Sequence, residues 1–309
     1  MANTCKICKC KDDHPTYIGQ EIRLGLGDTF SYFCCNNCGC LQIEDIPQNM
    51  QKYYENYYSV EQRNEKAYWL KNFIRRQLFA YRLNGKGNLG KIAAKCSQDY
   101  FFNEAFEWIV PEMFNFNSSI LDVGAGYGRL LQKMSHSGFS DTHGIDPFIE
   151  NDLEYKIGKR TLRIEKKDVY ELNRQYDVIM LHHVLEHIPD QNTVFEHLVK
   201  RMHSQSKLIV VIPMMSEYIW HHLGMNGFQL ADVPRHFYIH TQKSLSFLSE
   251  KHGLQLISDK YFGNKRILIS ADNKKQLSEL NKRPEDLAAT LVAKKDSGLA
   301  CFYFELKKQ

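Results

Sequence analysis

The chain has no long hydrophobic run and only a small excess of charge of one sign. Its longest apolar candidate, Leu208 to Met215, is far shorter than the roughly 18 residues that a membrane-spanning helix needs. The first residues, Met-Ala-Asn-Thr-Cys, contain no hydrophobic stretch typical of a secretion signal. A formal charge of +4 over 309 residues is too mild and too evenly spread to indicate a nucleic-acid partner. We therefore expect a cytoplasmic protein without a membrane span.

Cysteine is scarce after residue 40, where only Cys96 and Cys301 occur, but it is abundant before it. Two C-x-x-C pairs in this first segment can each supply two thiolates to a tetrahedral Zn²⁺ ion. Disulfides fit poorly with a chain that lacks a secretion signal. So short a segment rarely buries enough apolar surface to fold without a metal. We therefore predict a structural zinc ion, with Cys5, Cys8, Cys35 and Cys38 as its ligands.

The zinc ligand set has alternatives among neighbouring residues: Cys34 in place of Cys35, Cys10 or Cys40 in place of a neighbour, and His14. Gly39 favours the pair of Cys35 and Cys38, because the turn after the second thiolate of a zinc knuckle benefits from glycine. In the first pair Lys9 stands at the corresponding place. For His14, a solvent-exposed position in a loop is the simpler interpretation.

A glycine-rich turn occurs in the stretch Ile120–Gly128, which reads I-L-D-V-G-A-G-Y-G. Gly124 and Gly126 leave no Cβ between the backbone and a bound ligand. A dinucleotide fingerprint would need glycine at position 129, where Arg129 stands. Asp122 would repel a pyrophosphate but can attract a cationic amino-acid ligand. The turn therefore indicates a cofactor that carries an ammonium group and no phosphate.

Three further polar groups follow apolar segments in the sequence. Asp146 ends a short segment, H-G-I-D, where a carboxylate can bind both hydroxyls of a ribose. Asp168 follows a second β-type segment. His182 follows an apolar strand and opens the string H-H-V-L-E-H-I-P-D. Because ligands of parallel sheets bind beyond the carboxyl ends of the strands, we expect these residues and Asp122 at one edge of a sheet.

These motifs resemble those of class I S-adenosylmethionine-dependent methyltransferases. The run D-V-G-A-G-Y-G matches their motif I, D/E-x-G-x-G-x-G, and V-L-E-H-I-P-D resembles a signature of many small-molecule and sugar methyltransferases. The resemblance implies S-adenosylmethionine as cofactor, and in the family the position of Asp168 faces the adenine amino group. The cofactor-binding residues that we predict are Asp122, Gly124, Gly126, Asp146, Asp168, Val169 and His182.

The alternation of strands and helices from Ser119 onward predicts the fold. We expect strands near 119–123, 141–145, 161–165, 175–181, 207–212, 254–261 and 301–306, with 266–270 extending or pairing with the preceding strand. Helices are expected near 102–110, 128–137, 191–203 and 241–252, the last with Thr241 as its N-cap. Such alternation implies right-handed crossovers and a mainly parallel sheet. The predicted class is α/β, a Rossmann-like seven-stranded methyltransferase sheet with a small N-terminal zinc-binding module.

The predicted domain plan has three parts. Residues 1–46 form the zinc module, 47–110 a helical linker or lid, and 111–309 the methyltransferase domain. A stretch near 214–240 inserts into this domain as a substrate cap. The zinc segment also resembles the zinc-binding domain that precedes the core in bacterial sugar-modifying enzymes, including their P-x-x-x-x-x-Y-Y continuation at Pro47, Tyr53 and Tyr54. We assign no role to the polar segment 272–297.

An alcohol acceptor must lose a proton during methyl transfer, and histidine is the residue type best suited to remove it. The candidates are His182, His183, Glu186, His187, His221, His222, His236 and His240. His236 is preferred, because it follows Arg235 in a segment that resembles the acceptor-bordering P-R-H-x-x-x-x-T of the family. His183 and Glu186 follow as further catalytic candidates, whereas His187 is expected to brace its helix.

The predicted function is O-methylation of a sugar, nucleotide sugar or related small molecule. One alternative is an RNA methyltransferase, because a family that methylates guanine in ribosomal RNA also places a zinc module before a similar core. Against it, no N/D-P-P-Y tetrapeptide follows the fourth strand. The other alternative is a non-catalytic scaffold whose zinc module recruits a partner. The oligomeric state does not follow from the sequence.

Overall fold

The computed structural model describes residues 2–54, 69–85, 87–96, 113–227, 232–262 and 284–308. Its contacts define two compact units. The first unit consists of Met1–Tyr57, His183–Phe195 and Val210–Lys307, and the second of Tyr58–His182, Glu196–Ile209 and Lys308–Gln309. The helix expected near 102–110 and the strand expected at 266–270 lie outside the described residues.

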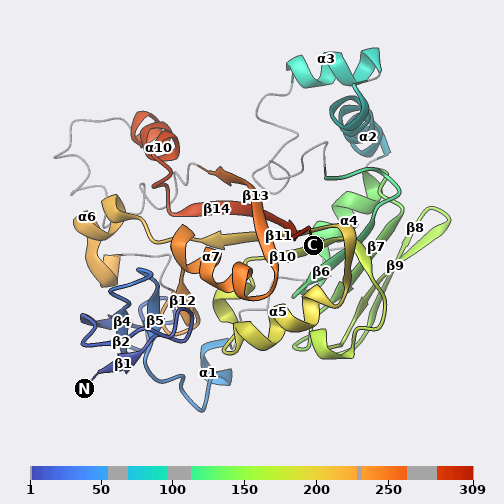
Figure 1. The fold of residues 1–309 in the computed structure, drawn as a ribbon. Helices are drawn as coiled ribbons and strands as arrows, with labels where there is room; N and C mark the ends of the chain where they lie inside the picture. The colour runs from blue at the N-terminus through green and yellow to red at the C-terminus, as the bar shows by residue number, and fades with distance from the viewer. Residues whose placement is uncertain are drawn as a thin grey trace. The chain divides into compact units, whose positions relative to one another are not determined.

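An eight-stranded sheet confirms the predicted α/β class (Figure 1). Its strands follow the order β13-β14-β11-β10-β6-β7-β9-β8. Their bounds are β6 (Ser119–Val123), β7 (Asp141–Ile145), β8 (Leu153–Ile157), β9 (Arg160–Glu165), β10 (Tyr176–His182), β11 (Met202–Pro213), β13 (Leu254–Tyr261) and β14 (Leu299–Leu306). The seven predicted strands are present, and the additional strand is β8, which forms an antiparallel pair with β9.

The strands of the second unit run in parallel where its predicted cofactor residues lie. β10 pairs with β6, β6 with β7, and β7 with β9, all in parallel register. Ile120 and Leu121 of β6 are fully buried, as expected for a parallel strand covered on both faces. The carboxyl ends of these strands therefore meet at one edge, where the predicted cofactor-binding residues lie.

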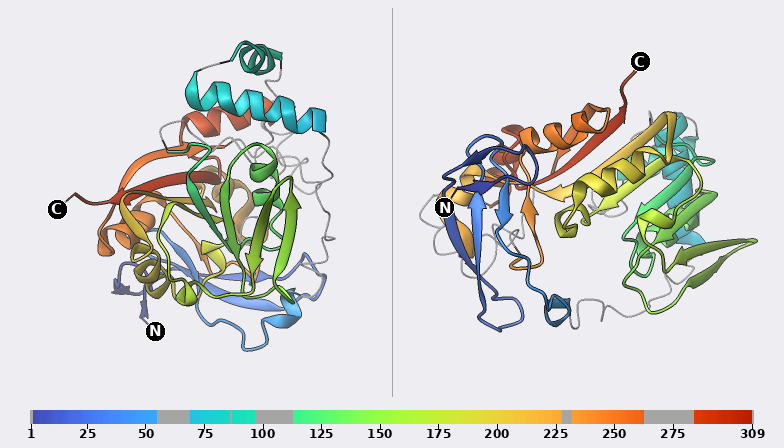
Figure 2. Two further views of the ribbon diagram at one scale, coloured as in Figure 1. Left: turned by 90° about the vertical axis from the view of Figure 1, so that its right-hand side faces the viewer. Right: turned by 60° about the horizontal axis from the view of Figure 1, so that its bottom comes forward.

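Helix packing in the second unit depends on glycine at two places. Helix α4 (Arg129–His136) starts after Gly128, whose φ of 68° lies in the left-handed region. Helices α2 (Trp69–Asn84) and α3 (Asn88–Cys96) pack against each other, as Figure 2 shows. A Cβ at Gly90 would lie 2.2 Å from the Gln77 carbonyl oxygen, so only glycine allows this approach.

The first unit is built on a small antiparallel sheet with the strand order β12-β5-β4-β3. These strands are β3 (Thr16–Gln20), β4 (Thr29–Cys34), β5 (Leu41–Ile43) and β12 (Tyr238–Ile239), and β1 (Asn3–Thr4) pairs with β2 (Lys11–Asp12) beside them in the sequence. The pairing of β12 with β5 joins the cysteine-rich segment to a strand almost 200 residues later. The sequence did not indicate this pairing, since a two-residue strand has no periodicity of its own.

The remaining described helices are α1 (Gln51–Tyr54), α5 (Gln191–Val199), α6 (Glu217–Gly227), α7 (Gln242–Lys251) and α10 (Pro284–Ala293), with short 3-10 turns η2 (Val169–Glu171) and η3 (Leu185–His187). Thr241 caps α7 as predicted, and its hydroxyl accepts a hydrogen bond from the Ser244 amide at 3.0 Å. Across the described ranges, no helix combines the length and apolar character that a membrane crossing would demand.

Candidate functional site

The glycine turn after β6 is open on one side. Gly124, Gly126 and Gly128 have φ values of 72°, 53° and 68°, which a side chain would strain. The amides of Gly124 and Ala125 donate to the Ile145 carbonyl at 2.8 and 3.0 Å, so the turn is fastened to the neighbouring strand. A Cβ built on Gly126 would meet nothing within 4 Å. The backbone at Gly126 therefore borders open space, as a cofactor cradle requires.

Asp146 fixes this turn through its side chain. Its Oδ2 accepts a hydrogen bond from the Gly126 amide at 2.8 Å, and its Oδ1 accepts one from the Phe148 amide at 2.8 Å. Burial raises the pKa of Asp146, and the two backbone hydrogen bonds oppose that rise. Each oxygen keeps a second lone pair, so the carboxylate can still accept hydrogen bonds from two hydroxyl groups of a ligand.

Asp122 is buried at the end of β6, with 3% of its surface exposed. Burial, together with the nearby charge of Asp146, raises the pKa of Asp122 to about 8. A buried carboxylate of this kind favours either a proton or a cationic ligand. The geometry thus agrees with the chemistry of an ammonium group, although the raised pKa itself was not visible in the sequence.

The other predicted cofactor residues lie at the same edge of the second unit. Asp168 caps η2, where its Oδ1 accepts from the Tyr170 amide at 3.4 Å, and the buried Val169 follows it. His182 is the last residue of β10. This hydrogen bond gives Asp168 a structural role. A ligand would therefore have to bind to the lone pairs of its carboxylate that the Tyr170 amide does not use.

Four cysteines of the first unit come together as the sequence predicted. The ligand atoms of Cys5, Cys8, Cys35 and Cys38 all lie within 4.8 Å of one another. The Sγ atoms of Cys5 and Cys38 are 3.6 Å apart and those of Cys8 and Cys35 are 3.5 Å apart. Four thiolates around a tetrahedral zinc ion would be separated by roughly 3.8 Å. The donor set therefore fits a Zn²⁺ ion.

The two C-x-x-C turns have the same backbone geometry. The amide of Lys9 donates to the Cys5 carbonyl at 3.1 Å, and that of Gly39 donates to the Cys35 carbonyl at 2.8 Å. Lys9 and Gly39 have φ values of 62° and 70°. Lys9 therefore adopts the left-handed conformation that glycine would adopt more easily, which explains why the missing glycine does not prevent a second knuckle.

The alternative zinc ligands lie outside this group of four. Cys34 and Cys40 donate to backbone carbonyls, of Gly39 and Leu41. Cys10 and His14 form a second group with Cys35. The interpretation of His14 as solvent-exposed is wrong: it is 4% exposed and its ring stacks on Phe33 at 5.3 Å, because the aromatic strand β4 passes beneath it.

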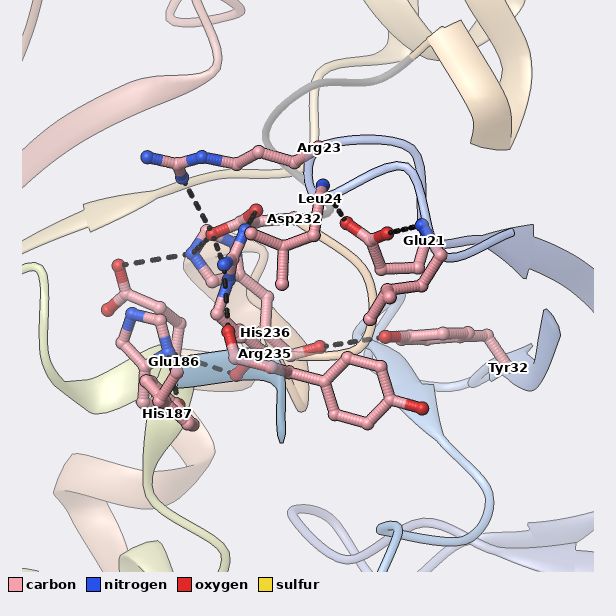
Figure 3. Close-up of polar contacts among 12 residues, drawn as sticks. Glu21, Arg23, Leu24, Tyr32, Glu186, His187, Asp232, Arg235 and His236 are labelled. Carbon is pink, nitrogen blue, oxygen red and sulfur yellow. Dashed lines mark hydrogen bonds and ion pairs between the residues drawn. The ribbon is translucent and has the colours of Figure 1, made fainter. Parts of the chain in front are cut away.

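One carboxylate and three histidines form a cluster in the first unit, at η3, just before η3 and before β12. Figure 3 shows three of its residues, Glu186, His187 and His236. Glu186 is fully buried. Its Oε1 lies 3.5 Å from Nδ1 of His183 and 3.9 Å from Nε2 of His236. Burial raises the pKa of Glu186, but His183, His187 and His236 outweigh this effect and lower it to about 2. Glu186 is therefore ionised.

The histidines of this cluster differ in exposure and in backbone. The side chain of His183 is 44% exposed, whereas that of His236 is 10% exposed. His183 has a φ of 57°, an uncommon conformation for a residue with a Cβ, which often marks functional positions. His187 donates from Nδ1 to the Arg235 carbonyl at 2.9 Å, so it braces this segment.

Sequence reasoning missed the residues that hold His236 in place. The buried Arg235 binds both carboxylate oxygens of Asp232, and its Nη1 donates to the Tyr53 carbonyl at 3.0 Å. Arg23 also donates to Asp232, at 3.2 Å (Figure 3). Nε2 of His236 lies 3.9 Å from Oδ2 of Asp232. The only sequence signal was the D-x-x-R spacing, which gives no hint of the partners at Tyr53 and Arg23.

The other histidine candidates do not belong to the group of ligand atoms around Glu186, although the charge of Glu186 acts on His240. His240 is fully buried and burial lowers its pKa to about 4, so it stays neutral. His221 and His222 belong to α6, where Nδ1 of His222 donates to the Tyr218 carbonyl at 2.8 Å. The chain region between 214 and 240 therefore contributes one histidine, His236, to the cluster with Glu186.

An open glycine turn with acidic residues at the ends of parallel strands is an arrangement of an α/β protein that can hold a cofactor. The family described as "Methyltransferase domain" matches residues 88–259. This match covers more than half of the 309 residues, and the chain belongs to this family. A search of curated proteins finds no match.

Solved structures with a similar fold include YcgJ from Bacillus subtilis, at 16% identity and a TM-score of 0.41, covering 63% of this chain and 94% of that chain. A second is the Burkholderia thailandensis 1,6-didemethyltoxoflavin-N1-methyltransferase with bound 1,6-didemethyltoxoflavin and S-adenosylhomocysteine. It has 12% identity and a TM-score of 0.41, covering 90% of this chain and 98% of that chain.

Proposed function

We propose that this protein transfers the methyl group of S-adenosylmethionine to a hydroxyl oxygen of a sugar, a nucleotide sugar or a related small molecule. The observation that carries the proposal is the open glycine turn, which Asp146 fastens beside the buried Asp122. When bound, the cofactor supplies a methyl group on a positively charged sulfur. The membership of this chain in the methyltransferase-domain family supports methyl transfer as the reaction.

The residues at this edge suit the parts of the cofactor. Asp146 would accept hydrogen bonds from the ribose hydroxyls, and Asp122 would neutralise the ammonium group. Gly124 and Gly126 allow the backbone to approach the ligand. Asp168 and Val169 would border the adenine. His182, the last residue of β10, would border the cofactor at the end of that strand.

On the acceptor side, we propose His183 as the base. Its Nδ1 lies toward Glu186, so a proton on this nitrogen is stabilised by an ionised carboxylate and Nε2 is the basic nitrogen. His183 is also far more exposed than His236, which we favoured from the sequence. His236 would instead position the acceptor wall, together with Glu186.

A polyhydroxylated acceptor fits the polar character of this cluster. Arg23, whose side chain is 61% exposed, and Asp232 are hydrogen-bonding groups beside His236. The segment 214–240 would form the acceptor cap within a domain spanning 111–309, after a zinc module at 1–46 and a helical segment at 47–110. The four cysteines would hold a structural zinc ion.

Methyl transfer from labelled S-adenosylmethionine to a panel of acceptors tests the proposal. The panel contains free sugars, nucleotide sugars, and ribosomal and transfer RNA. We expect label in a sugar-type compound, at an oxygen identified by mass spectrometry and NMR. Transfer to RNA would support the alternative enzyme class. A chain that fails to bind the cofactor in isothermal titration would indicate a scaffold, and both results overturn the proposal.

A further inference from the structure

Glu186 is a buried carboxyl group whose surroundings the proposed function does not explain. Its side chain is 0% exposed, and neither carboxylate oxygen accepts a hydrogen bond from any residue in the described part of the chain. A carboxyl group is costly to bury when its oxygens have no hydrogen-bond partner, and a bound metal ion is one way to provide a partner. The buried oxygens of Glu186 therefore have room for a ligand of this kind.

The cations fixed in the neighbourhood are already engaged. Arg235 binds both oxygens of Asp232, and Arg23 donates to the same carboxylate. The groups that face Glu186 are instead imidazoles, which carry a charge only when protonated. Two of them, His187 and His236, form with Glu186 a group whose ligand atoms all lie within 4.8 Å of one another.

The hydrogen bonds of His187 prepare it as a ligand. Its Nδ1 donates to the Arg235 carbonyl at 2.9 Å, which leaves Nε2 as the nitrogen with a lone pair. Metal-bound histidines almost always make such a bond with the other ring nitrogen. The ring of His187 lies edge-on to that of His236, with centroids 4.8 Å apart. Both rings come from segments that are anchored by backbone hydrogen bonds, including Phe237 N to Glu186 O at 2.8 Å.

We propose that Glu186, His187 and His236 bind a first-row divalent transition-metal ion, in a site separate from the four cysteines. Two imidazoles and one carboxylate suit Zn²⁺, Co²⁺ or Ni²⁺. A metal bound at about 2.1 Å needs ligand atoms roughly 3 to 3.5 Å apart, so the rings close on the carboxylate by about 1 Å on binding. The metal ion would then be the partner of the Glu186 oxygens, with His187 and His236 bound as neutral imidazoles.

The site would add to the chemistry at the acceptor side. Three protein ligands leave coordination positions open for oxygen ligands, and a hydroxyl bound there becomes more acidic. Oε1 of Glu186 is the oxygen nearest to both His183 and His236, so a metal bound there would lie beside the proposed base. This role at the acceptor rests on the proposed function, whereas metal binding itself does not.

Binding of Co²⁺ to the full chain, with its cysteine site loaded with zinc, tests the proposal without cofactor or acceptor. We expect one equivalent of Co²⁺ by isothermal titration. Zinc content stays constant during the titration, which separates this binding from exchange at the thiolates. Paramagnetic Co²⁺ should also shift the imidazole NMR signals of His187 and His236 in the unaltered chain, so the result does not depend on a variant folding.

Glu186→Gln and His187→Gln should each weaken Co²⁺ binding more than about 100-fold, since losing a direct ligand costs more than losing an outer partner. His203→Gln is the matched control, because His203 pairs with Asp177 at 3.1 Å outside the cluster; it should bind Co²⁺ normally. A zinc-loaded chain that binds no Co²⁺, or a His187→Gln chain that binds it as tightly as the unaltered one, overturns the proposal. Metal binding without methyl transfer would contradict only the proposed function.

Discussion

The two candidate sites of this protein are built in different ways. The residues of the cofactor edge lie in short motifs at the ends of consecutive strands, and the turn from Gly124 to Gly128 is a single contiguous piece. The histidine–carboxylate cluster instead combines η3, the segment before β12 and, through Arg235 and Asp232, Tyr53 and Arg23. A motif can be recognised in a sequence, whereas an assembly of distant segments cannot. Unfolding of the cysteine module should therefore abolish the histidine–carboxylate cluster. The cofactor edge should tolerate the same damage.

The largest effect is expected from removing the zinc ligands. A Cys35→Ser, Cys38→Ser double variant should lose about one zinc per chain and the structure of its module, because structural zinc supplies roughly 10 to 16 kcal/mol of apparent binding energy. Metal analysis and circular dichroism measure the loss, and titration with S-adenosylmethionine should give a nearly unchanged Kd. The control Cys10→Ser, outside the group of four, should keep its zinc. A double variant that stays folded with full metal would refute the ligand set.

Replacing the proposed base should affect turnover alone. His183→Gln should lower kcat by about 100-fold or more, because a positioned general base contributes that much. The Kd of S-adenosylmethionine should remain within about twofold, since His183 is not among the cofactor residues. Steady-state kinetics measure kcat, and titration calorimetry measures the Kd of S-adenosylmethionine. If His183→Gln leaves kcat unchanged, His183 is not the base, and His236, which the sequence alone indicated, becomes the candidate.

A smaller effect is expected at the cofactor edge. Asp146→Ala removes the acceptor of two backbone hydrogen bonds and of the expected ribose contacts. It should raise the Kd of S-adenosylmethionine about tenfold or more, on the order of one or two charge-assisted hydrogen bonds. Asp141→Ala, at the opposite end of the same strand, is the control and should leave the Kd unchanged. Equal affinities for both variants would contradict the assigned edge.

The smallest effect is expected for the release of a proton from Asp122 when the cofactor binds. Because the pKa of Asp122 is raised to about 8, its carboxyl is mainly protonated at pH 7, and a cationic ligand should displace the proton. Binding should therefore release up to one proton below pH 8 and tighten as the pH rises toward 8. Titration calorimetry in buffers of different ionisation enthalpy measures this release. Asp122→Asn should abolish it, and an unaltered release in that variant would assign the proton to another group.

The same raised pKa predicts how stability depends on pH without ligand. The folded chain keeps a proton on Asp122 up to about pH 8, whereas the unfolded chain loses it near pH 4. This contribution to the free energy of unfolding is therefore greatest at low pH and decreases as the pH rises through 8.

The sequence by itself determined the α/β class, the two strands at whose carboxyl ends Asp122 and Asp146 lie, and the C-x-x-C segments, because periodicity, glycine spacing and thiol spacing are local properties. It even located the cap of α7 at Thr241. Only the tertiary structure decided that β12 joins β5, that Asp232 and Arg235 hold the segment of His236, and that Glu186 is buried among histidines. These features depend on side chains from distant segments that meet only in the folded chain, and the loss of water around a carboxylate has no counterpart in the order of the residues.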